Sequence, residues 1–405
     1  MNVIRCIENR LRIEKEVEEG EGERMLSRIQ KEIGNGDGEG GGSLRMGWFG
    51  YAMEFLVNFV TCHEKNAEIV WKYMFPELMI KVLESDNVVA VSATTALLHN
   101  CVAILPERMK DVVGSWDERS ENKNVASALM RFLHDEDKDL EIGKSVGSVM
   151  DGFLWAFLVM KRIIDAGMIR DIFEVVGPSL RDIDMSHRKF YQSNVNFSLH
   201  QITLLGVIEG AMAKTVGRLE KSQDEMEEEE EEEENAPPPA VTDIIPTMQQ
   251  LEYFGELFKI AIHIEQADVA RLAIDILSSG FLLVRNPSAT NILKKQVLHQ
   301  VLDYLNHKEK DSVPETGLRG SCIRFIATVC DGNKELQDMV RQYEAIPPIL
   351  KAWRYDKDPA NNPLMREWAI LCIERLTADN AANREYVQEL VRGTKFGEEL
   401  SKRIG

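Results

Sequence analysis

A four-residue pattern occurs four times in this chain of 405 residues, and it constrains the fold more than any other feature. Each copy begins and ends with an apolar residue and has Asn, Thr or Arg in its third position: Leu56–Phe59, Leu98–Cys101, Ile326–Val329 and Ile373–Leu376. Twelve residues after each third position stands a valine, at Val70, Val112, Val340 and Val387. A chance match between apolar helices is the alternative, but it gives no reason for the same interval to recur. The pattern therefore indicates an internal repeat.

The length of the repeat and the spacing of apolar residues predict the type of fold. Asn58 and Asn100 are 42 residues apart and Thr328 and Arg375 are 47 apart, which is the period of armadillo and HEAT repeats. Apolar residues recur at three- and four-residue intervals through most of the chain, as they do in helices. We interpret each copy as the end of a long inner helix, followed by a turn and by the next helix, whose valine lies in the core. Because one repeat cannot bury its apolar faces alone, we expect an all-α, armadillo/HEAT-like helical repeat solenoid.

Two segments interrupt the helical periodicity and suggest how the chain is divided. Residues 34–42 read GNGDGEGGG, which is typical of a flexible linker, and residues 226–240 read MEEEEEEEENAPPPA, where like charges and prolines oppose a helix. We therefore predict five parts: an amino-terminal helix (1–33), a glycine-rich linker (34–47), amino-terminal armadillo-like repeats (48–221), a disordered acidic and proline-rich loop (222–242) and carboxyl-terminal armadillo-like repeats (243–405).

The carboxyl-terminal sequence resembles the ataxin-10 family. The resemblance is carried by RFIATVCDGNKELQDMV (324–340), AIPPIL (345–350) and NNPLMREWAILCIERLTADNAANREYV (361–387), and it is clear over about residues 318–390. In that family the end of the inner helix usually reads Leu-Arg-Asn-Leu. Asn58 and Asn100 match the asparagine of this motif, whereas Thr328 and Arg375 replace it in the carboxyl-terminal repeats.

This resemblance implies a cytoplasmic, armadillo-like scaffold without catalytic residues. It implies a role in holding other proteins, in cytokinesis or in cell signalling. A function of a different class stays open, because some armadillo-like proteins act as nucleotide-exchange factors for a heat-shock chaperone or a G protein. The residues themselves do not separate these two functions.

Charge and composition argue against several other functions. A net charge of -19 disfavours nucleic acid, whose phosphates are bound mainly by Lys and Arg. No segment approaches the roughly 20 apolar residues of a membrane-spanning helix, so we expect no membrane insertion. The eight histidines are scattered, and the six cysteines form no Cys-x-x-Cys pair and are interpreted as reduced core residues. We therefore predict no catalytic, cofactor-binding or metal-binding residues, no cofactor and no enzymatic activity.

The candidate binding residues lie at three places in the sequence. The amides of Asn58 and Asn100 would suit an extended peptide, because each offers a donor and an acceptor, although each could instead satisfy neighbouring backbone groups. Trp353 and Tyr355 stand beside charged residues and are interpreted as an exposed aromatic contact. Ser222 precedes Asp224 and Glu225 and is a candidate phosphorylation site next to an acidic loop, which would either attract a basic partner or serve only as a solvated spacer. The partners and the oligomeric state do not follow from the sequence.

Overall fold

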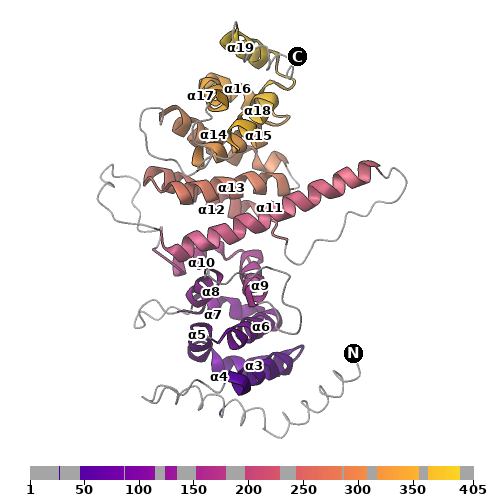
Figure 1. The fold of residues 1–405 in the computed structure, drawn as a ribbon, viewed down its shortest axis with the longest axis vertical. Coiled ribbons are helices and arrows are strands. Elements are labelled where there is room, and N and C mark those ends of the chain that lie inside the picture. The colour runs from indigo at the N-terminus through magenta and orange to yellow at the C-terminus, as the bar shows by residue number, and fades with distance from the viewer. Residues whose placement is uncertain are drawn as a thin grey trace. The chain divides into compact units, whose positions relative to one another are not determined.

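The structure is a computed structural model, and it describes residues 27, 46–85, 87–114, 124–134, 152–178, 197–228, 243–284, 287–307, 317–354 and 364–392. Within these ranges all regular structure is helical and no strand occurs (Figure 1). The all-α, helical-repeat fold predicted from the sequence is therefore confirmed. Apart from Ser27, the predicted amino-terminal helix and the glycine-rich linker up to residue 45 lie outside the described residues.

The chain forms two compact units. The first unit comprises residues 1–180 and 198–203, and the second comprises 181–197 and 204–405, so the boundary falls inside helix α11 (Leu199–Glu228). Helix α11 also continues further than expected, because residues 222–228 were assigned to the disordered loop. Glutamate is a good helix former, which explains why the helix enters the acidic run. Residues 229–242 lie outside the described residues.

The amino-terminal unit is built around three long helices that pack in chain order. Helix α3 (Met46–Val60) packs against α6 (Val88–Ile104), and α6 packs against α9 (Gly152–Asp165). Gly152 permits the second contact, because a Cβ atom there would lie 2.9 Å from Cα of Ser92. Shorter helices flank this stack: α4 (Glu64–Met74), α5 (Glu77–Leu83), η2 (Pro106–Arg108), α7 (Met109–Gly114), α8 (Val125–His134) and α10 (Ile169–Val175).

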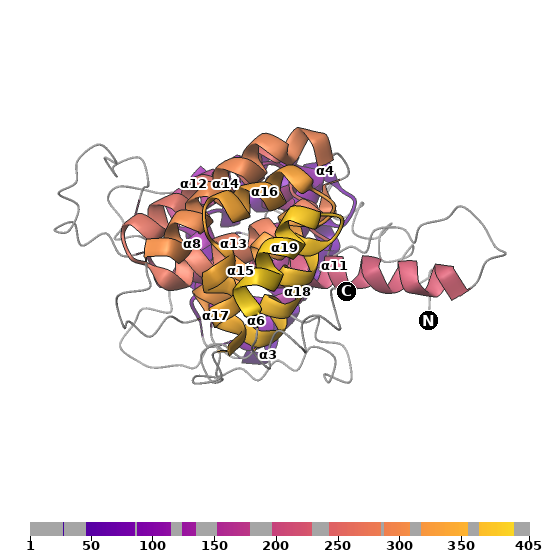
Figure 2. The same cartoon turned by 90° about the horizontal axis from the view of Figure 1, so that it is seen from above.

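The carboxyl-terminal unit repeats the arrangement. Helix α13 (Ala267–Leu283) packs against α15 (Leu318–Cys330), which packs against α18 (Met365–Thr377), and Figure 2 shows α15 and α18 side by side. Helix α12 (Met248–His263) covers α13, and its start is fixed by a capping box between Thr247 and Gln250. The remaining helices are α14 (Pro287–His307), α16 (Lys334–Gln342), α17 (Ile346–Arg354) and α19 (Ala381–Val391).

The repeated sequence pattern corresponds to a repeated turn between helices. Each of the four valines is fully buried: Val70, Val112, Val340 and Val387. Four residues after the third position of the pattern, Cys62, Gly332 and Asp379 adopt the left-handed conformation, and the next residue is the N-cap of the following helix. Two of those N-caps, Asn333 and Asn380, accept a backbone N–H three residues ahead. The predicted helix–turn–helix interpretation thus holds for these three copies, whereas after Leu98–Cys101 helix α6 continues to Ile104 and η2 follows.

The described cysteines follow the core interpretation with one exception. Cys101, Cys322, Cys330 and Cys372 are buried and free, and burial raises the pKa of the Cys101 thiol to about 12. Cys62 is also free but exposed, because it occupies a turn rather than a helix interior. Only the four buried thiols therefore have the predicted core role.

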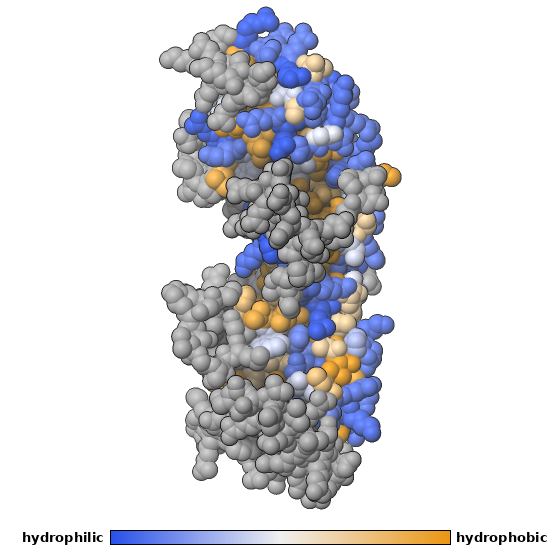
Figure 3. All heavy atoms as spheres, turned by 90° about the vertical axis from the view of Figure 1, so that its right-hand side faces the viewer, coloured by the Kyte–Doolittle hydropathy of each residue, from blue (hydrophilic) through white to orange (hydrophobic). Residues whose placement is uncertain are grey.

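The surface carries both polar and apolar residues. Figure 3 shows hydrophilic and hydrophobic residues interspersed over one face, and large exposed apolar side chains occur in both units, including Leu154, Leu282 and Ile292. Among the described residues, no single helix has the length and apolar composition needed to cross a membrane. Two consecutive segments, Val89–Ile104 and Pro106–Gly114, meet the criteria only when joined, and they are bent by 119°.

Candidate functional site

Polar side chains line up near the carboxyl ends of the three stacked helices of the amino-terminal unit. We call this set the amino-terminal row, and it consists of Asn58 and Thr61 beside α3, His99 and Asn100 on α6, and Arg162 on α9. The stacking of α3, α6 and α9 brings the row together, since these residues are far apart in the sequence. Two of its members are the asparagines predicted from the repeat.

Asn58 occupies the exposed end of the row. Its Nδ2 donates to the carbonyl of Glu54 at 3.0 Å, one turn earlier in the same helix. Its Oδ1 and its second amide hydrogen have no partner among the described residues. Asn58 therefore stays available as both a donor and an acceptor.

Asn100 links α6 to the end of α3. Its Nδ2 donates to Oγ1 of Thr61 at 3.3 Å, and that hydroxyl donates to the carbonyl of Val57 at 2.6 Å. Its Oδ1 lies 3.4 Å from Nδ1 of His99. Asn100 is half-buried and retains one amide hydrogen, so part of its hydrogen-bonding capacity is used internally.

His99 connects the row to α9. The Nε–H of Arg162 donates to Nε2 of His99 at 3.0 Å, so the neutral ring carries its proton on Nδ1 and donates to Asn100. Burial lowers the pKa of His99, and the charge of Arg162 lowers it further, against the opposing effect of the Asn100 bond. The indole of Trp155 lies beside the imidazole, with ring centroids 4.9 Å apart. His99 is therefore kept neutral as an acceptor for Arg162.

The carboxyl-terminal unit has charged residues at the corresponding helices. Asp275 on α13 accepts from Nη2 of Arg324 on α15 at 2.7 Å and lies 3.5 Å from Nη1 of Arg271. The guanidinium of Arg324 also lies over the Trp368 ring, 5.6 Å from its centroid. Burial raises the pKa of the Asp275 carboxyl despite the two arginines. This set, with Arg375 and its partner Asp331 at 2.7 Å, lacks the amide chemistry of the amino-terminal row.

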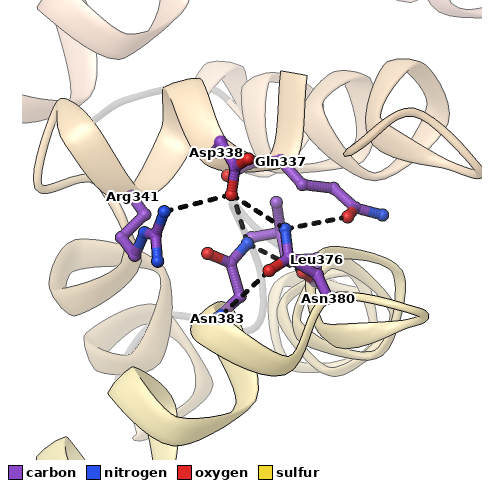
Figure 4. Close-up of polar contacts among 6 residues, drawn as sticks. All are labelled: Gln337, Asp338, Arg341, Leu376, Asn380 and Asn383. Atoms are coloured by element: carbon purple, nitrogen blue, oxygen red, sulfur yellow. Dashed lines mark hydrogen bonds and ion pairs between the residues drawn. The ribbon is translucent and has the colours of Figure 1, made fainter. Parts of the chain in front are cut away.

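A second polar cluster in this unit closes the end of the helix stack (Figure 4). The buried Nε2 of Gln337 lies 3.1 Å from the carbonyl oxygen of Cys330, 2.9 Å from that of Arg375 and 3.3 Å from that of Ala378, and its two hydrogens are shared among these three acceptors. Asn383 donates to the carbonyls of Leu376 and Gln337, and Figure 4 shows it beside Asn380 between α16, α18 and α19. Except for that of Gln337, the accepting carbonyls lie at the carboxyl ends of α15 and α18, where helices leave them open, so the cluster is structural.

The other predicted site residues are placed differently. Trp353 lies within α17 and is only 4% exposed, so the prediction of an exposed aromatic contact is wrong for this residue. Its charged neighbours suggested a loop, whereas α17 continues to Arg354. Tyr355 lies outside the described residues, and Ser222 lies within the bounds of α11. The described residues contain no group of three or more His, Cys, Asp or Glu placed to hold a metal ion.

Comparison with known proteins gives matches of two kinds. Residues 318–403 match the family described as spinocerebellar ataxia type 10 protein domain. Ataxin-10 of Bos taurus and of Homo sapiens are each 22% identical to this chain, over 88% of this chain and 68% of the relative. Ataxin-10 of Xenopus tropicalis is 34% identical over 89 residues, or 22% of this chain and 18% of the relative.

The family match begins at the first residue of α15 and includes α16 to α19, and therefore the polar cluster of Gln337, Asn380 and Asn383. The longer alignments extend the similarity to 88% of the chain. This chain is accordingly similar to ataxin-10 proteins, most specifically through residues 318–403.

Proposed function

We propose that this protein is a non-enzymatic scaffold that holds an extended segment of another protein along the amino-terminal row. One observation carries the proposal. Asn58 and Asn100 come from successive stacked helices, lie at equivalent positions of the repeat, and each keep part of their amide hydrogen-bonding capacity unused by the described residues.

The chemistry of the row suits a polypeptide backbone. A primary amide can donate to a carbonyl and accept from an N–H, which are the two groups that every peptide unit of an extended chain offers. Packed helices lie roughly 8–10 Å apart, and an extended chain rises by about 3.3 Å per residue. Consecutive positions of the row therefore match peptide units between two and three residues apart.

Similarity to ataxin-10 proteins supports the wider role. The resemblance implies a scaffold in the cytoplasm that acts in cytokinesis or cell signalling, and we propose this setting for the chain. Stacked repeats suit such a role because they present a long surface formed by many small units.

The proposal is tested by selecting binders from a displayed library of random peptides with the full chain as bait. We expect peptides that bind, and we expect Asn58→Ala to weaken their binding by about 3- to 10-fold, since one or two hydrogen bonds are lost. This variant removes no contact between helices, because Asn58 bonds only to its own helix.

Asn306→Ala provides the matched control. Asn306 is exposed on α14 and donates to the carbonyl of Tyr343 at 2.6 Å, so this variant loses one internal hydrogen bond, as Asn58→Ala does. Its affinity for the selected peptides should equal that of the wild type. Equal affinity of Asn58→Ala and wild type for every selected peptide would contradict the proposal.

A further inference from the structure

We propose that the segment bound along the amino-terminal row carries an aspartate or glutamate whose carboxylate binds the guanidinium of Arg162. This inference rests on the proposed function and specifies the chemistry of the partner. It follows from the hydrogen bonds and charges around the α9 end of the row.

Arg162 has no carboxylate partner among the described residues. Its Nε–H is used by His99, whereas the four N–H groups on Nη1 and Nη2 have no described partner. The neighbouring carboxylate, Asp165, accepts instead from Nζ of Lys161 at 2.5 Å. Arg162 is also half-buried and therefore partly desolvated. A partly desolvated charge without a counter-ion is costly, so a ligand that supplies one gains affinity.

The arginines on the stacked helices of the other unit show the contrast. Arg271 and Arg324 share Asp275, and Arg375 has Asp331. Each of these arginines already has a carboxylate from within the chain. Arg162 is the corresponding cation of the amino-terminal row, and its partner in our proposal comes from the bound segment.

The surroundings of Arg162 favour a carboxylate over a phosphate dianion. The group beside it is the neutral imidazole of His99, which contributes no positive charge. The single positive charge of the guanidinium then balances the single negative charge of a carboxylate. The two oxygens of the carboxylate also match the planar arrangement of the guanidinium N–H groups. A phosphate dianion would leave a negative charge uncompensated at this position.

The position of Arg162 also fixes where the acidic residue lies in the partner. Arg162 is on α9, one helix beyond Asn100. At the spacing between packed helices, the acidic side chain lies two to three residues along the segment from the peptide unit that Asn100 binds.

The test uses the full chain and the peptides selected by display. Each peptide is made with its acidic residues as they are, changed singly to Asn or Gln, or changed singly to phosphoserine. Affinities are measured for wild type, Arg162→Gln and Arg131→Gln. Arg131 is exposed on α8, so the control has the same change of charge in the same unit.

We expect one acidic position in each peptide whose amide variant binds wild type about 10-fold more weakly, as for the loss of a charge-assisted hydrogen bond. Arg162→Gln should bind the acidic and the amide peptide equally, while Arg131→Gln should keep the 10-fold preference. Arg162→Lys should restore part of it, because Lys keeps the charge and loses the fork. Thermal unfolding of Arg162→Gln shows whether the variant is folded at the assay temperature, and Arg162→Lys provides the second variant if it is not.

Three outcomes would overturn the inference. The acidic preference could survive in Arg162→Gln, the phosphoserine peptides could bind more tightly than their Asp or Glu parents, or neutralising Glu227–Glu234 to glutamine could raise peptide affinity 10-fold. The last result would identify the chain's own acidic run as the occupant. If no peptide binds the wild type at all, the proposed function itself fails, which distinguishes the two failures.

Discussion

At the scale of single residues, His99 has the most specific environment in the amino-terminal row. Its ring accepts from Arg162, which requires a neutral imidazole, and it donates to Asn100. The unfolded chain has no such requirement, so its His99 titrates near the ordinary value of 6.5. Because the folded pKa is lower, the unfolded state binds more protons between the two pKa values, and stability falls there as the pH falls.

We therefore predict that His99→Gln removes a part of the pH dependence of stability. Glutamine can accept from Arg162 but does not titrate. The free energy of unfolding of wild type minus that of the variant should be constant above about pH 7 and should shrink as the pH falls below 6.5. Urea unfolding at pH 7.5, 6.5 and 5.5 measures this difference. A difference that stays the same at all three values would show that His99 is not held neutral by the fold.

The sequence predicted some of these residues and could not predict others. Asn58 and Asn100 were found because the repeat aligned them, and the helix stack then placed them in one row. His99 and Arg162 were missed because they are 63 residues apart and come from different repeats, so their contact depends on tertiary packing. Trp353 was misassigned because the charges around it resembled a loop, and local composition does not reveal which helix face is covered.

At the scale of helices, the structure explains why the repeat keeps its spacing across the turn. Asn66 and Asn383 each lie four residues after a left-handed residue, and each donates to a carbonyl seven residues earlier, of Phe59 and Leu376 respectively. In both units, a buried asparagine after the turn thus bonds to a carbonyl at the end of the preceding helix. An insertion in the turn would separate that amide from the helix end that it satisfies.

We predict that Asn383→Ala destabilises the carboxyl-terminal unit by about 1–3 kcal/mol, the typical cost of leaving buried polar groups unsatisfied. The loss should appear first in α19, which packs on α16 and α18. Hydrogen exchange of the α19 amides, compared with those of α13, measures it. The exposed Asn306→Ala should change α19 exchange little, and equal effects of the two variants would argue against the capping role of Asn383.

At the scale of the whole molecule, the chain is divided into two compact units, each with its own helix stack. Sequence periodicity predicted the helices and the repeats. The acidic, proline-rich composition of residues 222–242 predicted a disordered loop between two blocks of repeats. Charge repulsion suggested a break there, whereas glutamate also favours helix and α11 continues to Glu228. Composition alone did not show whether charge repulsion or the helix propensity of glutamate would determine where α11 ends.

Because repeats contact mainly their neighbours, damage in one unit should remain local. We predict that Val70→Ala and Val387→Ala each cost about 2 kcal/mol through lost burial and the cavity left behind. Val70→Ala should increase hydrogen exchange in α4 and α6, and Val387→Ala should do so in α18 and α19. Exchange that rises throughout the chain in either variant would indicate a single cooperative unit instead.

Residues with positive φ in the turns lower the free energy of unfolding of this protein below the value that it could reach. Cys62 and Glu344 hold positive φ values of 64° and 55°, a conformation that costs side-chain-bearing residues roughly 1–2 kcal/mol and glycine almost nothing. Glycine already stands at position 332, which is equivalent to Cys62, whereas Glu344 follows the end of α16. Changing Cys62 or Glu344 to glycine should raise the free energy of unfolding by up to about 1 kcal/mol, which urea unfolding measures. Selection keeps proteins only as stable as their function requires, and these turns show where this chain still has room to gain.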